Sequence, residues 1–365
     1  MGLESLLAAG LFNALNAAKA EGDLARRDTL LNELRALAET YPDDAAVRES
    51  LARGLFNTLN DAKTEEDLPR CDALLDELRA LARNYPDDLA VCEQLASGLV
   101  LVNTSSDPNA QGHLTKHDAL LEELRALARR HPDDTAVRRS LAMGISNNLV
   151  YAQAEGNRTS CDGLLGDLRA LAEDHSGDAG VRHMLAKGLF AAVNATKVEH
   201  GSIHRDALLD ELRGIARSNV DDTTVREWLA DSLFNALNFA IAENDLARRD
   251  ALLNELQVLT RGYPEAAAVR QRVAMALTNT VAAAEHERDL ARRDALLDEL
   301  RAMARSYPND VRQQLAIALG NTLAYAKADG DLARHDALLD ELRGLTRAYP
   351  EADAIRGILG RLKGT

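Results

Sequence analysis

The sequence repeats itself about every 44 residues, and no other feature constrains the fold as strongly. Each repeat contains a leucine pair that is followed three residues later by another leucine. Such self-similarity is typical of arrays in which one supersecondary unit packs against the next. The first leucine of the pair is Leu30, Leu74, Leu120, Leu164, Leu208, Leu252, Leu296 and Leu338. We therefore divide the chain into the repeats 1–44, 45–88, 89–134, 135–178, 179–222, 223–266, 267–310 and 311–352, followed by a segment at 353–365.

The hydrophobic pattern within each repeat predicts two helices. In the second repeat, Val47 and Leu51 belong to an apolar stripe at helical spacing, which predicts a helix over 45–64. Asp67, a favourable N-cap residue, precedes a second stripe that ends near Asn84. The short connection between the two helices makes them antiparallel.

One such hairpin cannot cover its own apolar face, so neighbouring hairpins must stack. We therefore predict an all-α fold, an α-α superhelix (solenoid) of eight antiparallel hairpins. It forms a single repeat domain over 1–365, and 353–365 is expected to form a short C-terminal capping helix.

Charge and cysteine content narrow the possible functions. The formal net charge of -15 opposes nucleic-acid binding, because neutralising phosphates requires a basic surface, and it favours a cationic or neutral partner. Cys71, Cys92 and Cys161 form no CxxC pair, which favours a reducing compartment. No signal peptide is evident, and no apolar run approaches the ~18 residues of a membrane span. We expect a soluble, cytoplasmic protein that binds neither nucleic acid nor membrane.

Motifs for catalysis or cofactor binding are absent from the sequence. It has no glycine-rich phosphate loop, no Gly-x-Ser-x-Gly turn and no HExxH motif. His113 and His117 share a helical spacing, as do His200 and His204, but neither pair has a third ligand close in sequence. We therefore expect no enzymatic activity, no cofactor and no metal.

The hairpin resembles the tetratricopeptide repeat (TPR) family. Leu51 matches that family's first-helix leucine, Leu74 and Leu78 match its second-helix small and apolar positions, and Pro86 matches its closing proline. The repeat departs from the family in its length of about 44 rather than 34 residues. Arg48 also replaces the family's first-helix aromatic residue.

This resemblance implies a right-handed TPR-like solenoid whose first helices line a concave groove. It also implies that the groove binds proteins or peptides, without catalysis and without a cofactor.

The repeats can be compared position by position. A mid-helix glycine column predicts close approach of another helix, since glycine otherwise costs up to ~1 kcal/mol against alanine in a helix. It contains Gly10, Gly54, Gly98, Gly144 and Gly188. Phe12, Phe56, Phe190 and Phe234 form a second column, two positions further on. These rings either pack between repeats or offer apolar contacts to a ligand, because the same position also accepts Ser146 and Gly320.

Two asparagine columns follow on the same helix. Asparagine both donates and accepts hydrogen bonds, so a row of it can bind the backbone of an extended peptide, or it can join neighbouring hairpins. The first asparagine column is Asn13, Asn57, Asn147, Asn235, Asn279 and Asn321, and the second is Asn16, Asn60, Asn194 and Asn238.

Two further columns have structural interpretations. An aspartate column that includes Asp28 and Asp72 recurs in all eight repeats and is a candidate partner for the asparagines. Arg48 and its equivalents follow the "YPDD" turn, where they can stack on the preceding tyrosine, such as Tyr41, or pair with the acidic turn.

We predict a non-enzymatic scaffold that binds a protein or an extended peptide on the first-helix face, as a monomer or homodimer. The alternative is a structural or regulatory arm of a larger multidomain protein, or a self-assembling scaffold. The candidate partner-binding residues are Phe12, Asn13, Asn16, Phe56, Asn57, Asn60, Asn147, Phe190, Asn194, Phe234, Asn235, Asn238, Asn279 and Asn321.

Overall fold

The computed structural model describes residues 2–104, 113–195, 202–219 and 221–349. All regular secondary structure in this part of the chain is α-helical, which confirms the predicted all-α class. The capping helix expected at 353–365 lies outside the described residues. None of the helices that the structure describes is both long and apolar enough to cross a membrane.

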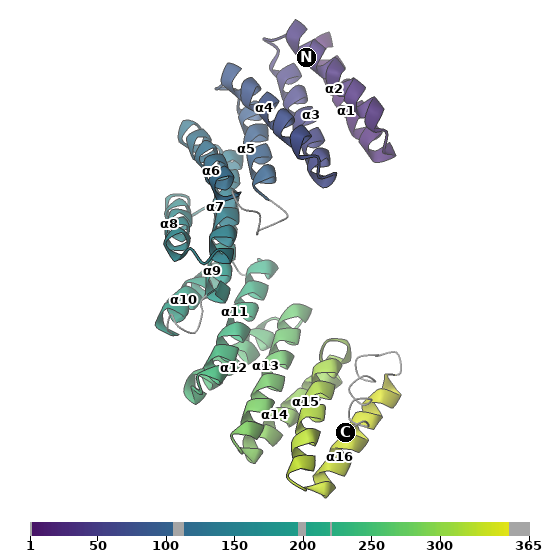
Figure 1. The fold of residues 1–365 in the computed structure, drawn as a ribbon, viewed down its shortest axis with the longest axis vertical. Coiled ribbons are helices and arrows are strands. Elements are labelled where there is room, and N and C mark those ends of the chain that lie inside the picture. The colour runs from purple at the N-terminus through teal and green to yellow at the C-terminus, as the bar shows by residue number, and fades with distance from the viewer. Residues whose placement is uncertain (1, 105–112, 196–201, 220, 350–365) are drawn as a thin grey trace. The chain divides into compact units, whose positions relative to one another are not determined.

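The helices alternate between the first and second members of successive hairpins (Figure 1). The first helices are α1 (Leu3–Glu21), α3 (Ala45–Thr64), α5 (Leu89–Asn103), α7 (Thr135–Ala154), α9 (Ala179–Ala195), α11 (Thr223–Ala242), α13 (Ala267–His286) and α15 (Pro308–Ala328). The second helices are α2 (Leu24–Thr40), α4 (Leu68–Asn84), α6 (His113–Arg130), α8 (Arg158–Asp174), α10 (Ser202–Ser218), α12 (Leu246–Gly262), α14 (Leu290–Ser306) and α16 (Leu332–Ala348).

The chain divides into two compact halves, Met1–Ala191 and Ala192–Thr365, which we describe separately. In the N-terminal half, α1 packs on α2 and α3, and α5 packs on α3 and α7. In the C-terminal half, α11, α13 and α15 pack in sequence, each against its own second helix. Each half is therefore a stack of antiparallel hairpins, and the first helices form one layer of it.

Aspartates start most of these helices as the sequence predicts. The Asp44 carboxylate accepts hydrogen bonds from the Ala46 and Val47 backbone at the start of α3. Asp67 accepts one from the Arg70 backbone at 3.2 Å at the start of α4. Because these groups satisfy otherwise unpaired N–H groups, the "PDD" turns fix where one hairpin ends and the next begins.

Leucines of the preceding hairpin cover the glycine column from Gly54 onward. A Cβ added to Gly54 would lie 3.2 Å from the Leu34 side chain and 3.4 Å from that of Leu31. At Gly188 the corresponding contacts are Leu168 at 2.9 Å and Leu149 at 3.1 Å. The close approach that the glycines predict is therefore present in the structure.

Candidate functional site on the first-helix face

The asparagine columns join neighbouring first helices to each other. The Asn57 side-chain amide of α3 donates to Asn16 Oδ1 of α1 at 2.8 Å. In the C-terminal half, Asn235 donates to Asn194 at 2.7 Å and Asn279 donates to Asn238 at 2.8 Å. Each bond links a first-column asparagine to the second-column asparagine of the preceding repeat. The bonded partners are thus asparagine pairs on successive first helices.

Four candidate asparagines form no bond of this kind among the described residues, and for three of them the matching position holds another residue. The position that would supply the bonding partner holds Leu101 in the case of Asn60, Thr104 in the case of Asn147 and Ala282 in the case of Asn321. Asn13, on α1, and Asn321 are exposed, whereas Asn147 is buried and its Nδ2 has no hydrogen-bond acceptor among the residues that the structure describes. The asparagine row is therefore interrupted at these places.

The phenylalanine column is partly buried, and its member Phe234 belongs to the core. Phe12, Phe56 and Phe190 are half-buried, while Phe234 is buried. The Arg272 guanidinium of α13 lies 6.0 Å from the Phe234 ring centroid and is ion-paired with Asp231. Phe56 and Phe234 directly precede the paired residues Asn57 and Asn235 in the chain, and Arg272 of the next first helix lies near the Phe234 ring.

Each asparagine pair leaves hydrogen-bonding capacity unused. One Asn–Asn bond uses one donor of the first carboxamide and one lone pair of the second. Asn16, Asn57, Asn194 and Asn235 are half-buried, so their remaining donors and acceptors border solvent. The pairs can therefore accept further hydrogen bonds from a polar backbone laid across them.

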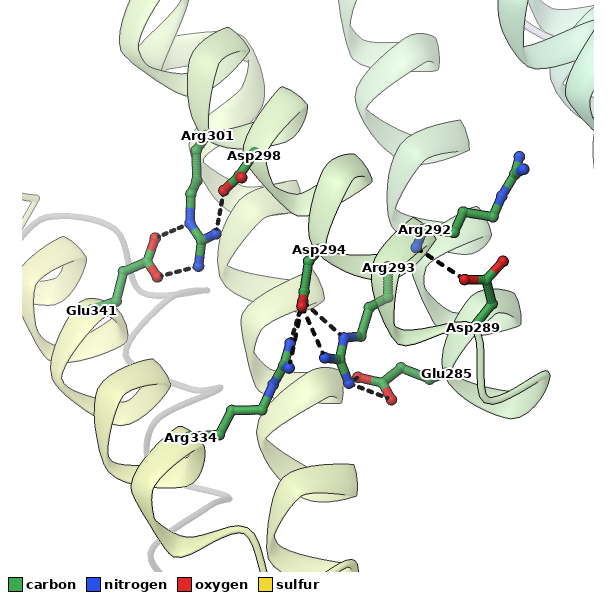
Figure 2. A network of polar contacts seen from close by, with 9 residues as sticks. All are labelled: Glu285, Asp289, Arg292, Arg293, Asp294, Asp298, Arg301, Arg334 and Glu341. Atoms are coloured by element: carbon green, nitrogen blue, oxygen red, sulfur yellow. Dashed lines mark hydrogen bonds and ion pairs between the residues drawn. The ribbon is translucent and has the colours of Figure 1, made fainter.

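Among the described residues, the aspartate column forms no bond with the two asparagine columns. Asp118 accepts from Asn148, which lies outside those columns, at 3.5 Å, and Asp162 pairs with Arg158 of its own helix. Five other members accept from basic side chains on the second helix of the following repeat, as in Lys116–Asp72 (2.9 Å) and Arg248–Asp206 (2.6 Å). In Figure 2 Arg334 of α16 makes this contact with Asp294 of α14. The suggested Asn–Asp bond between the columns is therefore replaced by charge pairs between second helices.

A second row of ion pairs runs along the second helices. Arg79 forms a two-pronged pair with Glu123 at 2.9 and 2.8 Å, and Arg301 forms one with Glu341 at 2.8 and 2.7 Å (Figure 2). Hydrogen bonding to Glu341 raises the pKa of Arg301. Because both prongs are satisfied, these pairs fix the alignment of adjacent repeats.

The arginines that follow the "YPDD" turns stack on a different tyrosine from the one expected. Arg48 lies 4.5 Å above the Tyr85 ring, and Arg226 lies 4.0 Å above Tyr263, so the partner is the tyrosine of the next turn. Arg48 Nε also donates to Asp88 at 2.7 Å. The prediction that these arginines stack on the preceding tyrosine is therefore wrong. Each arginine side chain extends across the contact between repeats to the tyrosine of the next turn.

A buried column at the start of the second helices was not singled out from the sequence. Arg27 pairs there with Asp61 of the next first helix at 3.2 Å. At equivalent places His117 stacks on Tyr151 with 4.2 Å between ring centroids, and Arg205 stacks on Phe239. The two members of each pair are 34 residues apart, so comparing columns at that separation could have revealed them.

Groups of residues that could hold a metal are absent from the described ranges. Of the sequence-selected histidines, His117 is buried against Tyr151 and contacts Asn103, which leaves it inside the hairpin stack. His200 lies outside the described residues.

No protein-family model matches the chain, and no curated protein matches it. One solved structure that matches is described as a circular tandem repeat protein with novel repeat topology and enhanced subunit contact surfaces. It is 14% identical, with a TM-score of 0.39 over 99% of this chain and 98% of that chain.

Proposed function

We propose that the protein is a non-enzymatic scaffold that binds an extended peptide segment of another protein along its first-helix face. The observation that carries this proposal is the recurring Asn–Asn pair, which occurs as Asn16–Asn57 in the N-terminal half and as Asn194–Asn235 and Asn238–Asn279 in the C-terminal half. Each pair is held in position by its own bond, so little side-chain entropy remains to be lost on binding.

An extended peptide suits this surface chemically. Its backbone presents alternating N–H and C=O groups, and a carboxamide can bind both kinds. The half-buried rings of Phe12 and Phe56 can supply apolar contacts beside the first pair. The net charge of -15 favours a peptide that is neutral or cationic.

The TPR resemblance supports the same proposal. We propose that the repeat is a TPR-like hairpin enlarged to about 44 residues, with its first helices lining a concave groove, and that the protein acts in the cytoplasm. The successive hairpins within each half support the comparison, because TPR proteins likewise stack their first helices in one layer.

A binding screen followed by paired substitutions tests the proposal. The full chain is screened against a displayed library of random extended peptides, and the affinity of the best binder is measured by fluorescence anisotropy. The Asn57→Ala variant should bind that peptide about fivefold more weakly, because a hydrogen bond contributes ~1 kcal/mol. The Phe56→Ser variant should bind it more weakly still. Asp76→Ala is the matched control, since Asp76 lies exposed on the second helix of the same repeat.

The proposal fails if the screen yields no binder, or if the Asp76→Ala and Asn57→Ala variants lose affinity equally. Unchanged circular dichroism of each variant shows that any loss comes from the surface and not from unfolding.

A further inference from the structure

A groove lies between the second helices α4 and α6 of the N-terminal half, near the residues where both helices end. It encloses about 330 Å³, at the lower end of the ~300–1,000 Å³ that is typical of small-molecule sites. Its floor is apolar, because Ala82, Leu95 and Leu127 line it and are 5, 6 and 9% exposed. The exposed Ala126 also lines it. This α4–α6 groove therefore offers solvent a small apolar surface.

Two arginines border the α4–α6 groove without a charged partner. Arg83 lies in the last turn of α4, Arg130 ends α6, and both are exposed. Neither forms a hydrogen bond or an ion pair with any residue that the structure describes. Arg79, which also lines the groove, is by contrast held by both oxygens of Glu123. Two guanidinium groups with unused donors thus lie beside an apolar floor.

Helix stability explains only one of these two arginines. A cation near the C-terminus of a helix interacts favourably with the helix dipole, and a basic residue at the position of Arg83 recurs in most repeats, for example as Arg305. The position of Arg130 is different, since it holds Asn84 in the preceding repeat and Asp174 in the following one. The second arginine is therefore a feature of this groove and not of the repeat.

The neighbouring contacts between second helices lack this pair of charges. At the positions of Arg83 and Arg130, the contact of α2 with α4 has Glu39 and Asn84. The contact of α6 with α8 has Arg129 and Asp174. Both neighbours thus place an acidic residue where the α4–α6 groove places an arginine. In a chain with a net charge of -15, two unbalanced arginines at one groove favour an anionic ligand.

We propose that the α4–α6 groove binds a small carboxylic acid, with its carboxylate between Arg83 and Arg130 and its apolar body on the floor. The planar guanidinium group matches the geometry of a carboxylate, and covering the apolar floor adds to the affinity. The pair of arginines occurs once in the array, which suits a small ligand held within one contact between repeats. No asparagine or phenylalanine of the first-helix face lines the groove, so this proposal is independent of peptide binding.

Isothermal titration calorimetry of the full chain with octanoate tests the proposal. Octanoate should bind saturably, with one molecule per chain. Octanol lacks the charge and inorganic phosphate lacks the apolar body, so each should bind at least ~10-fold more weakly. Arg83→Gln and Arg130→Gln should each weaken octanoate about fivefold, the effect of one exposed charge pair. Both arginines are exposed, so both variants should fold, and circular dichroism checks this.

Arg129→Gln is the matched control. Arg129 is exposed on the same helix but does not line the groove, so this variant loses the same charge and should bind octanoate like the unaltered chain. The proposal is overturned if octanoate shows no saturable binding below ~1 mM, or if inorganic phosphate binds as tightly as octanoate. It is also overturned if Arg129→Gln weakens octanoate as much as Arg130→Gln does, because the attraction would then come from the general charge of α6.

Discussion

The guanidinium of Arg205 lies 3.9 Å above the centre of the Phe239 ring, and the arginine is 0% exposed. In the described part of the chain, none of its three side-chain nitrogens has a hydrogen-bond acceptor. Burial and the nearby Arg248 lower the pKa of Arg205. The equivalent Arg249 is also buried but pairs with Glu287 at 2.5 Å. The same buried position therefore holds one arginine that is ion-paired with a glutamate and one that stacks on an aromatic ring instead.

Replacing Arg205 by leucine should raise the stability of the protein. A buried charge without an acceptor costs desolvation energy, and apolar replacement of buried charges often stabilises by about 1–4 kcal/mol. Arg249→Leu is the matched control and should lower stability by about 1–3 kcal/mol, because it leaves Glu287 without its partner. Urea unfolding followed by circular dichroism measures both variants. A fall in the urea midpoint for Arg205→Leu would contradict the prediction.

The sequence predicted the hairpins well because their signals are local. The helix expected over 45–64 matches α3 at Ala45–Thr64, and the expected start after Asp67 matches α4 at Leu68. Apolar spacing and capping residues act within one or two turns, so they can be recognised without knowing what packs on the helix. The division into a single domain over 1–365 stays a prediction, since the chain separates into two compact halves that are described individually.

The candidate site was predicted less completely, because its contacts cross between repeats. Asn57 bonds to Asn16 over a separation of 41 residues, and Arg48 stacks on Tyr85 rather than on Tyr41. Such partners depend on how far one hairpin is displaced relative to the next, which no local pattern specifies. A partner-binding role for the asparagine and phenylalanine columns stays a prediction.

Lowering the pH should reduce the stability of the N-terminal half, in part because Asp178 becomes protonated. Burial by itself would raise the pKa of the Asp178 carboxyl group. The carboxylate accepts hydrogen bonds from Arg139 at 3.0 Å, from Arg138 at 3.3 Å and from the Gly180 backbone. These bonds outweigh burial and lower the pKa of Asp178 below its usual value of 3.8. Because its pKa is lower in the folded protein than in the unfolded chain, the Asp178 carboxylate stabilises the fold fully when the pH is above its unfolded-state pKa. This stabilisation is lost as the pH falls through the folded-state pKa.

Asp178→Asn isolates this contribution, because asparagine retains the N-cap. The variant should be less stable than the unaltered chain at pH 7, and the difference should shrink as the pH falls below about 4. Urea midpoints measured from pH 7 to the acid limit of folding test this. A difference that stays constant with pH would show that the charge of Asp178 is not responsible.

The three cysteines should differ in reactivity. Burial raises the pKa of Cys92 to about 11, and Cys92 is buried, whereas Cys161 is half-buried. At pH 8 only about one Cys92 thiol in a thousand is ionised, and the thiolate is the reactive form. A disulfide reagent should therefore label Cys161 first in the native protein and Cys92 only after unfolding, as followed by mass spectrometry of the peptides. Native labelling of Cys92 at the rate of Cys161 would contradict this.

Alanine replacement of two column glycines should have opposite effects on stability. At Gly10 the new methyl group meets nothing, so Gly10→Ala should stabilise by about 0.5–1 kcal/mol through helix propensity. At Gly188 it would lie 2.9 Å from Leu168 and 3.1 Å from Leu149, so the leucines must move. Overpacking of this kind typically costs about 1–3 kcal/mol, which exceeds the gain in propensity. Thermal unfolding of both variants measures the contrast, and equal stabilisation at the two sites would show that the helices do not approach closely at Gly188.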